Sequence, residues 1–348
     1  MPEPRSPLRL LLDGDALVAN WRWLERQGAG AACGAAVKAD GYGLGAREIV
    51  VRLAEAGCRD FFVATWAEAE PLIPLLGPAS LSVLHGFAGE EAARFEGSPA
   101  RPVLNTPLQV ERWKQGAPGR ACDVMIDTGI NRLGLSPAQV GEGILDGLEI
   151  DTVMSHLASA DEDEAMNARQ RSAFLEVAAR IPAKRRSLAN SAGICLGTDY
   201  AFDLTRPGLA LYGGVPRREA EGHIRQVVRV EARIVQRRRV EAGGSVGYNS
   251  TWTARAPAEL AILNIGYADG YLRGFSGTGR ARLERGFAPV VGRVSMDLTA
   301  LLVDEAPELE EGDWVELDYA LPAASEQSGL SQYELLTTLG RRHDRVWT

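Results

Sequence analysis

Short apolar runs alternate with longer amphipathic segments along the first 215 residues of the chain. Apolar runs bounded by turn residues are typical of buried strands, and longer segments with apolar positions three or four residues apart are typical of helices. The pattern predicts eight strands, at ACGAAVKA, DFFVAT, LSVLHGF, RPVLN, CDVMID, DTVMSH, RRSLAN and DLTRPGLALYG. Helices are predicted at residues 15–27, before the first strand, and at 44–57, 65–76, 89–95, 106–115, 136–145 and 164–181, with a brief one within 191–200.

Strands that alternate with helices predict parallel pairing, and eight such units predict a closed (β/α)8 barrel of the TIM type. After residue 222 the pattern changes to strand-like segments with Gly-rich turns and little helix, at QVVRVEARIV, AELAILNIGYADGY, APVVGRVSMDLTALLVD and GDWVELDY. The last predicted helix is SQYELLTTLGRR. We therefore expect an α/β protein with a barrel over residues 1–222 and a mainly β domain over residues 223–348.

Composition and charge narrow the classes of function. The 348 residues carry 38 basic and 46 acidic side chains, and the net charge of −8 argues against binding to nucleic acid or to anionic membranes. No apolar stretch approaches the length of a membrane span, and the N-terminus MPEPRSPLRLLLDGD lacks the features of a secretory signal. The cysteines are far apart and form no metal-binding cluster, so we predict no metal site and expect free thiols in a reducing cytoplasm: Cys33, Cys58, Cys122 and Cys195.

A lysine, Lys38, ends the first predicted strand and is followed by the turn ADGYG. Two interpretations are open for a buried strand that ends on a cation. The aliphatic stem can be buried while the ammonium group stays in water. Alternatively, a lysine in an apolar pocket can lose its proton and attack carbonyl groups, including the aldehyde of pyridoxal phosphate.

The C-terminal ends of the strands form the rim of such a barrel, where its chemistry takes place. The predicted rim carries Lys38, Arg132, His156, Asn190, Ser191 and Arg206. Each has an ordinary structural explanation, such as a satisfied core histidine for His156, a loop salt bridge for Arg132 and a strand-end cap for Arg206. Together, however, several polar and basic groups at one end of an apolar barrel indicate a catalytic mouth.

Two stretches on this rim suit a phosphate group. NSAGI places a hydroxyl and free backbone N–H groups at a predicted helix start, and RPGLALYGG places Gly208 where the backbone can approach a ligand closely. Neither matches the glycine patterns of nucleotide-binding loops.

Nine motifs, in order along both predicted domains, resemble those of the alanine racemases, which are pyridoxal-phosphate enzymes with a barrel and a β domain. The motifs are AAVKADGYGLGA, MIDTGINRLGLS, MSHLASADE, LANSAG, TRPGLALYG, SVGYNSTW, NIGYADGY, VGRVSMDL and YELLTTLGRR. The resemblance implies interconversion of L-alanine and D-alanine, pyridoxal 5′-phosphate as cofactor, and a cytoplasmic homodimer with shared active sites. It also implies that the D-alanine formed is used in the bacterial cell wall.

The resemblance implies roles for four residues near the reaction. Lys38 would carry the cofactor as a Schiff base and, once displaced by substrate, act as the base on one face. Tyr248, from the other subunit of the dimer, would be the base on the opposite face. His156 would touch Tyr248 and the cofactor ring, and Arg206 would face the pyridine nitrogen. A phenol needs neighbouring positive charge or hydrogen bonds to act as a base near neutral pH. Without the family pattern, Tyr248 would be explained as an aromatic residue at a strand edge.

Further residues are assigned by the same resemblance. The other cofactor-binding residues would be Tyr42, Asn190, Ser191, Gly208 and Arg341. The substrate carboxylate would face Arg132 and the backbone N–H of Met296, and Tyr267 would narrow the entrance. Asp297 and Arg273 match positions in the same corridor.

The sequence departs from the family pattern at three positions. Met125 replaces a lysine that many members carry as a carbamate beside Arg132, so we expect an acidic side chain, an anion or water to orient Arg132 instead. Arg341 aligns with a family tyrosine that contacts the phosphate, and Asn249 follows Tyr248 where glycine is frequent.

Three other functions stay open from the sequence. The chain could be a racemase for another or broader range of substrates, such as serine. It could be a pyridoxal-phosphate amino-acid decarboxylase, although Arg206 argues against that chemistry. It could also be a pyridoxal-phosphate carrier made of a lone barrel, which the residues after 222 argue against.

Overall fold

The computed structural model describes residues 6–88 and 98–348, so the helix predicted at residues 89–95 lies outside the described residues. The chain divides into two compact units. One comprises Leu17–Leu211 and Val215–Arg225. The other comprises the chain up to Ala16, Tyr212–Gly214 and Gln226–Thr348. We call them the barrel unit and the sheet unit.

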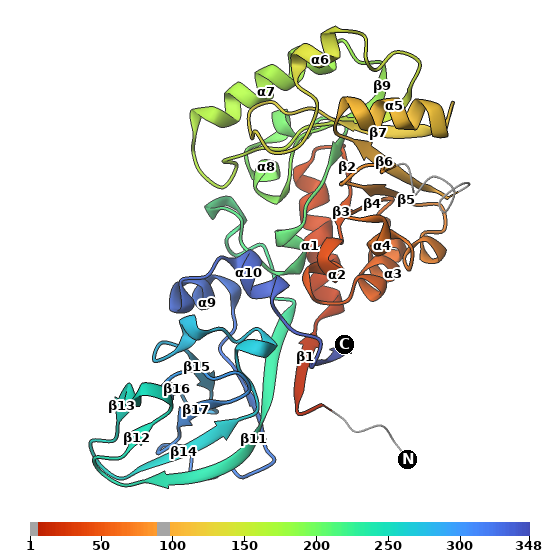
Figure 1. The fold of residues 1–348 in the computed structure, drawn as a ribbon. Coiled ribbons are helices and arrows are strands. Elements are labelled where there is room, and N and C mark those ends of the chain that lie inside the picture. Colours follow the sequence, from red (N-terminus) through yellow and green to blue (C-terminus); the bar gives the residue numbers. More distant parts are fainter. Residues whose placement is uncertain (1–5, 89–97) are drawn as a thin grey trace. The chain divides into compact units, whose positions relative to one another are not determined.

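The barrel unit is built on parallel strands in sequence order (Figure 1). The strands are β2 (Ala32–Cys33), β3 (Ala35–Ala36), β4 (Asp60–Val63), β5 (Ser80–Val83), β6 (Ala100–Leu104), β7 (Ala121–Met125), β8 (Glu149–Met154), β9 (Ala183–Ser187) and β10 (Leu204–Thr205). Strand β10 closes the ring, because it pairs with β2 and because Arg206 N–H, just after β10, donates to Ala189 O, just after β9, at 2.8 Å. The predicted barrel of eight strands is therefore confirmed, with β2 and β3 as two parts of the first strand.

Gly34 separates β2 from β3, and its neighbours leave no room for a side chain. A Cβ atom there would lie 2.8 Å from Asp60 O and 2.8 Å from the ring of Phe62. The first strand therefore needs glycine at this position to approach β4 closely.

Helices lie outside the ring of strands (Figure 1). They are α1 (Gly14–Gln27), α3 (Ala46–Ala56), α4 (Trp66–Ala69), α5 (Pro107–Gly116), α6 (Pro137–Gly141), α7 (Ala165–Ala178) and α8 (Ser191–Cys195). Thr106 and Ser136 cap α5 and α6, each followed by proline at the first helical position. The predicted helix 65–76 is shorter than expected, because Pro71 and Pro74 cannot continue the ladder of α4.

Along each barrel strand, side chains point alternately to the apolar outer face and to the barrel interior. Cys122 and Val124 of β7 pack in one apolar cluster with Trp113 of α5 and Phe174 of α7. Since successive side chains of a strand point to opposite faces, Asp123 between them faces the barrel interior.

The sheet unit is mainly β, as expected. Its sheet has the order β15-β16-β17-β14-β11-β1-β19, with β18 also paired to β11. The elements are β1 (Leu8–Leu12), β11 (Val228–Val240), β14 (Ala258–Leu263), β15 (Arg280–Arg282), β16 (Phe287–Val291), β17 (Thr299–Leu302), β18 (Trp314–Glu316), β19 (Asp344–Trp347), the hairpin of β12 (Ser245–Val246) and β13 (Trp252–Thr253), α9 (Leu321–Ser328) and α10 (Gln332–Thr337). Strand β1 was not among the predicted strands, although its buried residues Leu8, Leu10 and Leu12 alternate with part-buried ones as in a strand.

Candidate active site

Lys38 follows β3 and opens a left-handed turn, labelled α2 (Lys38–Tyr42) in Figure 1. Ala39, Asp40 and Tyr42 have φ of 52°, 52° and 56°, a conformation that costs a non-glycine residue about 1–2 kcal/mol. Hydrogen bonds hold the turn, because Ala39 N–H donates to Glu68 Oε1 at 2.9 Å and Ala46 N–H donates to Asp40 Oδ1 at 2.9 Å. Strain of this kind persists where surrounding contacts enforce it, often at functional sites.

Lys38 is half-buried in an electropositive rim. Burial and the charge of Arg132 lower the pKa of Lys38, Glu68 opposes this shift, and Arg206 lowers the pKa further. An amine with a lowered pKa is neutral more often and can act as a nucleophile or base. This environment favours the chemical interpretation of Lys38 over a solvated ammonium group.

Arg206 is 6% exposed and hydrogen-bonds to two serines inside the barrel. Its Nη2 donates to Ser155 O at 2.6 Å, and its Nη1 donates to Ser187 Oγ. Burial lowers the pKa of Arg206 to about 10, so it remains a cation near neutral pH.

His156 follows β8 on the same rim. Burial, and then the charges of Arg206, Arg132 and Lys38, lower the pKa of His156 to about 3. The imidazole is therefore neutral near neutral pH and can accept or donate a hydrogen bond without adding charge to the rim.

Tyr42, Ser191 and Gly208 form a compact group of donors. Ser191 Oγ accepts from Gly208 N–H at 2.9 Å and from Ala210 N–H at 3.2 Å. A Cβ atom on Gly208 would lie 2.2 Å from the hydroxyl oxygen of Tyr42, so only glycine fits there. Asn190 caps α8, with Oδ1 accepting from Gly193 N–H at 2.8 Å. Hydroxyl and backbone N–H donors of this kind suit a phosphate group.

Arg132 lies on a loop whose backbone is fixed by Asp127. Asp127 Oδ2 accepts from Arg132 N–H at 2.9 Å, and Oδ1 accepts from Gly129 N–H at 2.8 Å. Among the described residues, no acidic side chain pairs with the exposed Arg132 guanidinium, so the expected acidic substitute for the family lysine at Met125 is not found in this part of the chain. The guanidinium is thus available to an anionic ligand.

In the sheet unit, Tyr267 lies beside the loop that carries Met296. Tyr267 N–H donates to Ser295 O at 3.0 Å, and Ala268 N–H donates to Met296 O at 3.0 Å. The guanidinium carbon of Arg273 lies 5.2 Å from the centre of the Tyr267 ring. These contacts bring Tyr267, Arg273 and Met296 together.

Arg342 fixes the same corner of the sheet unit and was missed by the sequence analysis. Its Nη1 donates to Asp297 Oδ1 at 2.7 Å, and its Nε donates to Asp269 Oδ1 at 2.6 Å. The neighbouring Arg341, which the family resemblance assigns to the cofactor, is exposed. Two adjacent arginines in LGRR give no sequence signal of which one bonds to the two aspartates.

Tyr248 lies at the tip of the hairpin of β12 and β13, and its side chain is 67% exposed. Asn249 has φ of 63°, a left-handed conformation that asparagine tolerates well, which accounts for asparagine where glycine is frequent. The hairpin touches the segment that leads to Met296, because a Cβ atom on Gly292 would lie 2.6 Å from Val246 O.

The predicted residues thus form two groups, one in each unit. The barrel unit holds Lys38, Tyr42, Arg132, His156, Asn190, Ser191, Arg206 and Gly208. The sheet unit holds Tyr248, Tyr267, Met296 and Arg341. The sequence analysis also missed Glu68, which the capping pattern Thr65-x-x-Glu68 at the start of α4 could have indicated.

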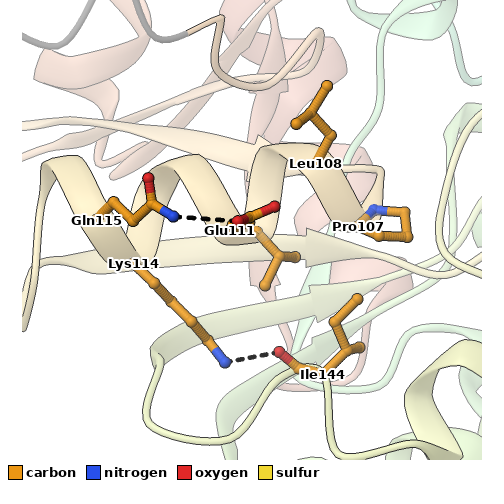
Figure 2. Close-up of a pocket in the computed structure, with 7 residues that line it drawn as sticks. Pro107, Leu108, Glu111, Lys114, Gln115 and Ile144 are labelled. Carbon is orange, nitrogen blue, oxygen red and sulfur yellow. Dashed lines mark hydrogen bonds between the residues drawn. The ribbon is translucent and has the colours of Figure 1, made fainter.

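A separate groove along α5 contains none of the predicted residues (Figure 2). Its polar groups are already engaged, because Lys114 Nζ donates to Ile144 O at 2.8 Å and Gln115 Nε2 donates to Glu111 Oε1 at 3.1 Å. The groove therefore has few polar groups left to bind a ligand.

In the described part of the chain, every helix is too short or too polar to span a membrane.

Comparison with known proteins gives consistent matches over both units. The family "Alanine racemase, N-terminal domain" matches residues 12–216, and "Alanine racemase, C-terminal domain" matches residues 227–347. An alanine racemase of Methylobacterium nodulans is 43% identical over 97% of this chain and 95% of its own length. One of Rhodospirillum rubrum is 41% identical over 99% of this chain and 96% of its own length.

Solved structures agree with these matches. The alanine racemase of Bartonella henselae, determined with covalently bound pyridoxal phosphate, has a TM-score of 0.91 and 36% identity, over 99% of this chain and 100% of that chain. The biosynthetic alanine racemase of Pseudomonas aeruginosa has a TM-score of 0.90 and 31% identity, with the same coverage of 99% and 100%.

Proposed function

Because this chain belongs to the alanine racemase family and interconverts L-alanine and D-alanine with pyridoxal 5′-phosphate as cofactor, we propose that Lys38 and Tyr248 are its two bases. Racemisation removes the Cα proton on one face of the amino acid and returns a proton on the other. Lys38 Nζ would serve one face and the phenol oxygen of Tyr248 the other. When bound, pyridoxal phosphate supplies an electron sink that stabilises the negative charge left on Cα.

The barrel rim fits this cofactor. The hydroxyl groups of Tyr42 and Ser191 would hold the phosphate beside Gly208, whose N–H donates to Ser191 Oγ and whose lack of a Cβ atom leaves room for the Tyr42 hydroxyl. The amine of Lys38 suits the aldehyde group. Asn190 would support the cradle by capping α8, and we assign Arg341 to the phosphate on the family alignment alone.

The remaining groups would orient the substrate and restrain side reactions. The guanidinium of Arg132, unpaired with any acidic side chain among the described residues, and the N–H of the exposed Met296 suit the substrate carboxylate. Tyr267, stacked by Arg273, would narrow the entrance. Arg206 would face the pyridine nitrogen, where its cation disfavours protonation of that nitrogen near neutral pH. Neutral His156 would touch Tyr248 and the cofactor ring and form hydrogen bonds with them.

The observation that carries the assignment of Lys38 is its half-buried amine on a rim of cations, within the unit that holds the phosphate cradle. The chain has only two other lysines. Lys114 is bonded to Ile144 O, and the exposed Lys184 pairs with Glu149 at 2.9 Å.

This small number of lysines makes a direct test possible. Borohydride reduction of the holoenzyme followed by peptide mapping should place the cofactor on the peptide of Lys38 alone. Recovery of the cofactor on the peptide of Lys114 or Lys184 would refute the assignment.

We further propose a homodimer in which Tyr248 acts in the active site of the partner subunit, since a ring that is 67% exposed is accessible to a second chain. The substitutions Lys38→Ala and Tyr248→Phe should each abolish racemisation. Mixing the two inactive variants under subunit exchange should restore roughly a quarter of wild-type activity. Half of the dimers would be mixed, and one of their two sites would hold both bases.

The outcome separates two arrangements. If Tyr248 served its own subunit, every mixed dimer would lack one base at each site and no activity would return. Mixing Lys38→Ala with Lys38→Arg is the matched control and should restore no activity.

We also propose a cytoplasmic location, because all four cysteines are free thiols.

A further inference from the structure

We propose that Asp123, below the rim in the barrel interior, is a positioning residue for the reaction that supplies the counter-charge of Arg206. This inference rests on the proposed role of Arg206 at the pyridine nitrogen. It concerns a residue that no motif of the sequence analysis singled out.

Arg206 is a buried cation without a carboxylate in contact. Its guanidinium donates hydrogen bonds to the neutral oxygens of Ser155 and Ser187. Among the described residues, no carboxylate forms an ion pair with this guanidinium. Its guanidinium carbon also lies 6.0 Å from the ring centre of Phe62, on β4. Removing an unpaired ion from water costs several kcal/mol, so a buried charge needs compensation nearby.

An ionic network fills the barrel interior near the start of the strands. We call it the floor network, and its members are Asp60 (β4), Arg101 (β6), Asp123 (β7), Asp151 (β8) and Arg185 (β9). Arg185 Nη2 lies 2.8 Å from Asp60 Oδ1 and 2.8 Å from Asp151 Oδ2. Arg101 lies 3.0 Å from Asp151 Oδ2 through Nη2 and 3.5 Å from Asp123 Oδ1 through Nε.

The floor network carries more carboxylates than guanidinium groups. Its three aspartates outnumber its two arginines, which leaves one negative charge in excess. Asp60 and Asp151 are in close contact with Arg185, whereas Asp123 has only the longer contact with Arg101. The excess charge is therefore assigned to Asp123, and Arg206 lacks a counter-charge of its own.

Asp123 is fully buried, and both of its carboxylate oxygens accept a hydrogen bond. Ser82 Oγ donates to Asp123 Oδ2 at 2.6 Å, and Thr152 N–H donates to Oδ1 at 3.0 Å. Burial, and to a smaller extent Asp151, raise the pKa of Asp123, and Arg101 and these two donors oppose that shift without cancelling it. In turn, the charge of Asp123 raises the pKa of Arg206 against the effect of burial. This compensation matters because the amine of Lys38, whose pKa Arg206 lowers, would add a charge of the same sign, and His156 is neutral.

The first test measures coupling between the two residues in the full chain freed of cofactor, so that cofactor affinity does not contribute. The cycle comprises wild type, Asp123→Asn, Arg206→Met and the double variant. The effect of Asp123→Asn on the melting temperature should differ by roughly 2–4 °C between the two Arg206 backgrounds. Asp151→Asn is the matched control, because it removes the same charge from the floor network. Its coupling to Arg206→Met should be clearly smaller. Additive effects for Asp123, or equal coupling for both aspartates, would overturn the proposal.

The second test uses the holoenzyme and does not require Arg206→Met to fold. Loss of the Arg206 proton at alkaline pH should change the absorbance of the bound cofactor. In Asp123→Asn this transition should move to lower pH by about one unit, because the cation loses its counter-charge. Asp123→Glu, which keeps the charge, and Asp151→Asn should keep the transition near its wild-type position. An unchanged transition in Asp123→Asn would overturn the proposal. If coupling appears in the first test but the cofactor spectrum never responds, the assigned role of Arg206 fails while its pairing with Asp123 stands.

Discussion

At the residue scale, the rim places three basic side chains near a histidine. Burial, and then the charges of Arg206, Arg132 and Lys38, disfavour a proton on His156, which therefore stays neutral near neutral pH. The folded protein therefore binds a proton at His156 far less readily than the unfolded chain does. A difference in proton affinity between two states makes stability depend on pH.

For His156 the pKa in the folded protein, about 3, lies below its ordinary value of 6.5. Its contribution to stability is thus complete above about pH 6.5 and is lost as the pH falls toward 3. The slope from this residue is at most about 1.4 kcal/mol per pH unit. Denaturant unfolding of the apoprotein at several pH values should show a shallower loss of stability in His156→Gln than in wild type. The same substitution at the exposed His223 is the control, and equal slopes in His156→Gln and wild type would contradict the argument.

At the element scale, the turn after β3 shows what sequence pattern cannot foresee. The apolar run ending at Lys38 and the glycines behind it predicted a strand and a turn, and both are present. Periodicity carries no information on handedness, however, and three non-glycine residues here adopt positive φ because Glu68 and Asp40 hold them. The same limitation applies to the serines that bind Arg206, since nothing local marks Ser187 as the partner of an arginine 19 residues away.

Gly41, inside this turn, gives a direct prediction. Its φ is +63°, and a Cβ atom would lie 2.4 Å from Cδ1 of Ile49 and 3.2 Å from Ala46. Gly41→Ala should lower the free energy of unfolding by about 2–4 kcal/mol, from backbone strain and overpacking combined. It should also weaken cofactor binding, because Lys38 and Tyr42 flank it. Gly77→Ala is a matched control, since φ is +53° with no atom within 4 Å of the added Cβ. Denaturant unfolding and cofactor titration of both variants measure these effects. An equal loss of stability in Gly41→Ala and Gly77→Ala would show that packing at Gly41 contributes nothing.

At the scale of the whole molecule, the two ends of the described chain meet in one sheet. Strand β1 lies between β11, which it pairs antiparallel, and β19, which it pairs in parallel. The sequence pattern located the mainly β segment after residue 222 but not this pairing, because contact between residues more than 300 positions apart leaves no periodic signal. The alternation of Leu8, Leu10 and Leu12 was visible, yet a run of five residues does not say which sheet it joins.

This pairing predicts that stability near the N-terminus depends on residues near the C-terminus. Thr348 N–H donates to Leu12 O at 2.9 Å, and alternate residues of a parallel strand donate to the same neighbour, so the N–H of Val346 faces β1. Val346→Pro removes that donor and should cost about 1–3 kcal/mol. Val346→Ala is the control, because the side chain is 41% exposed and contributes little packing. Amide hydrogen exchange should show faster exchange in Leu8–Leu12 for Val346→Pro alone. If β1 kept its wild-type protection in that variant, its order would come from β11 alone and the two chain ends would be independent of each other.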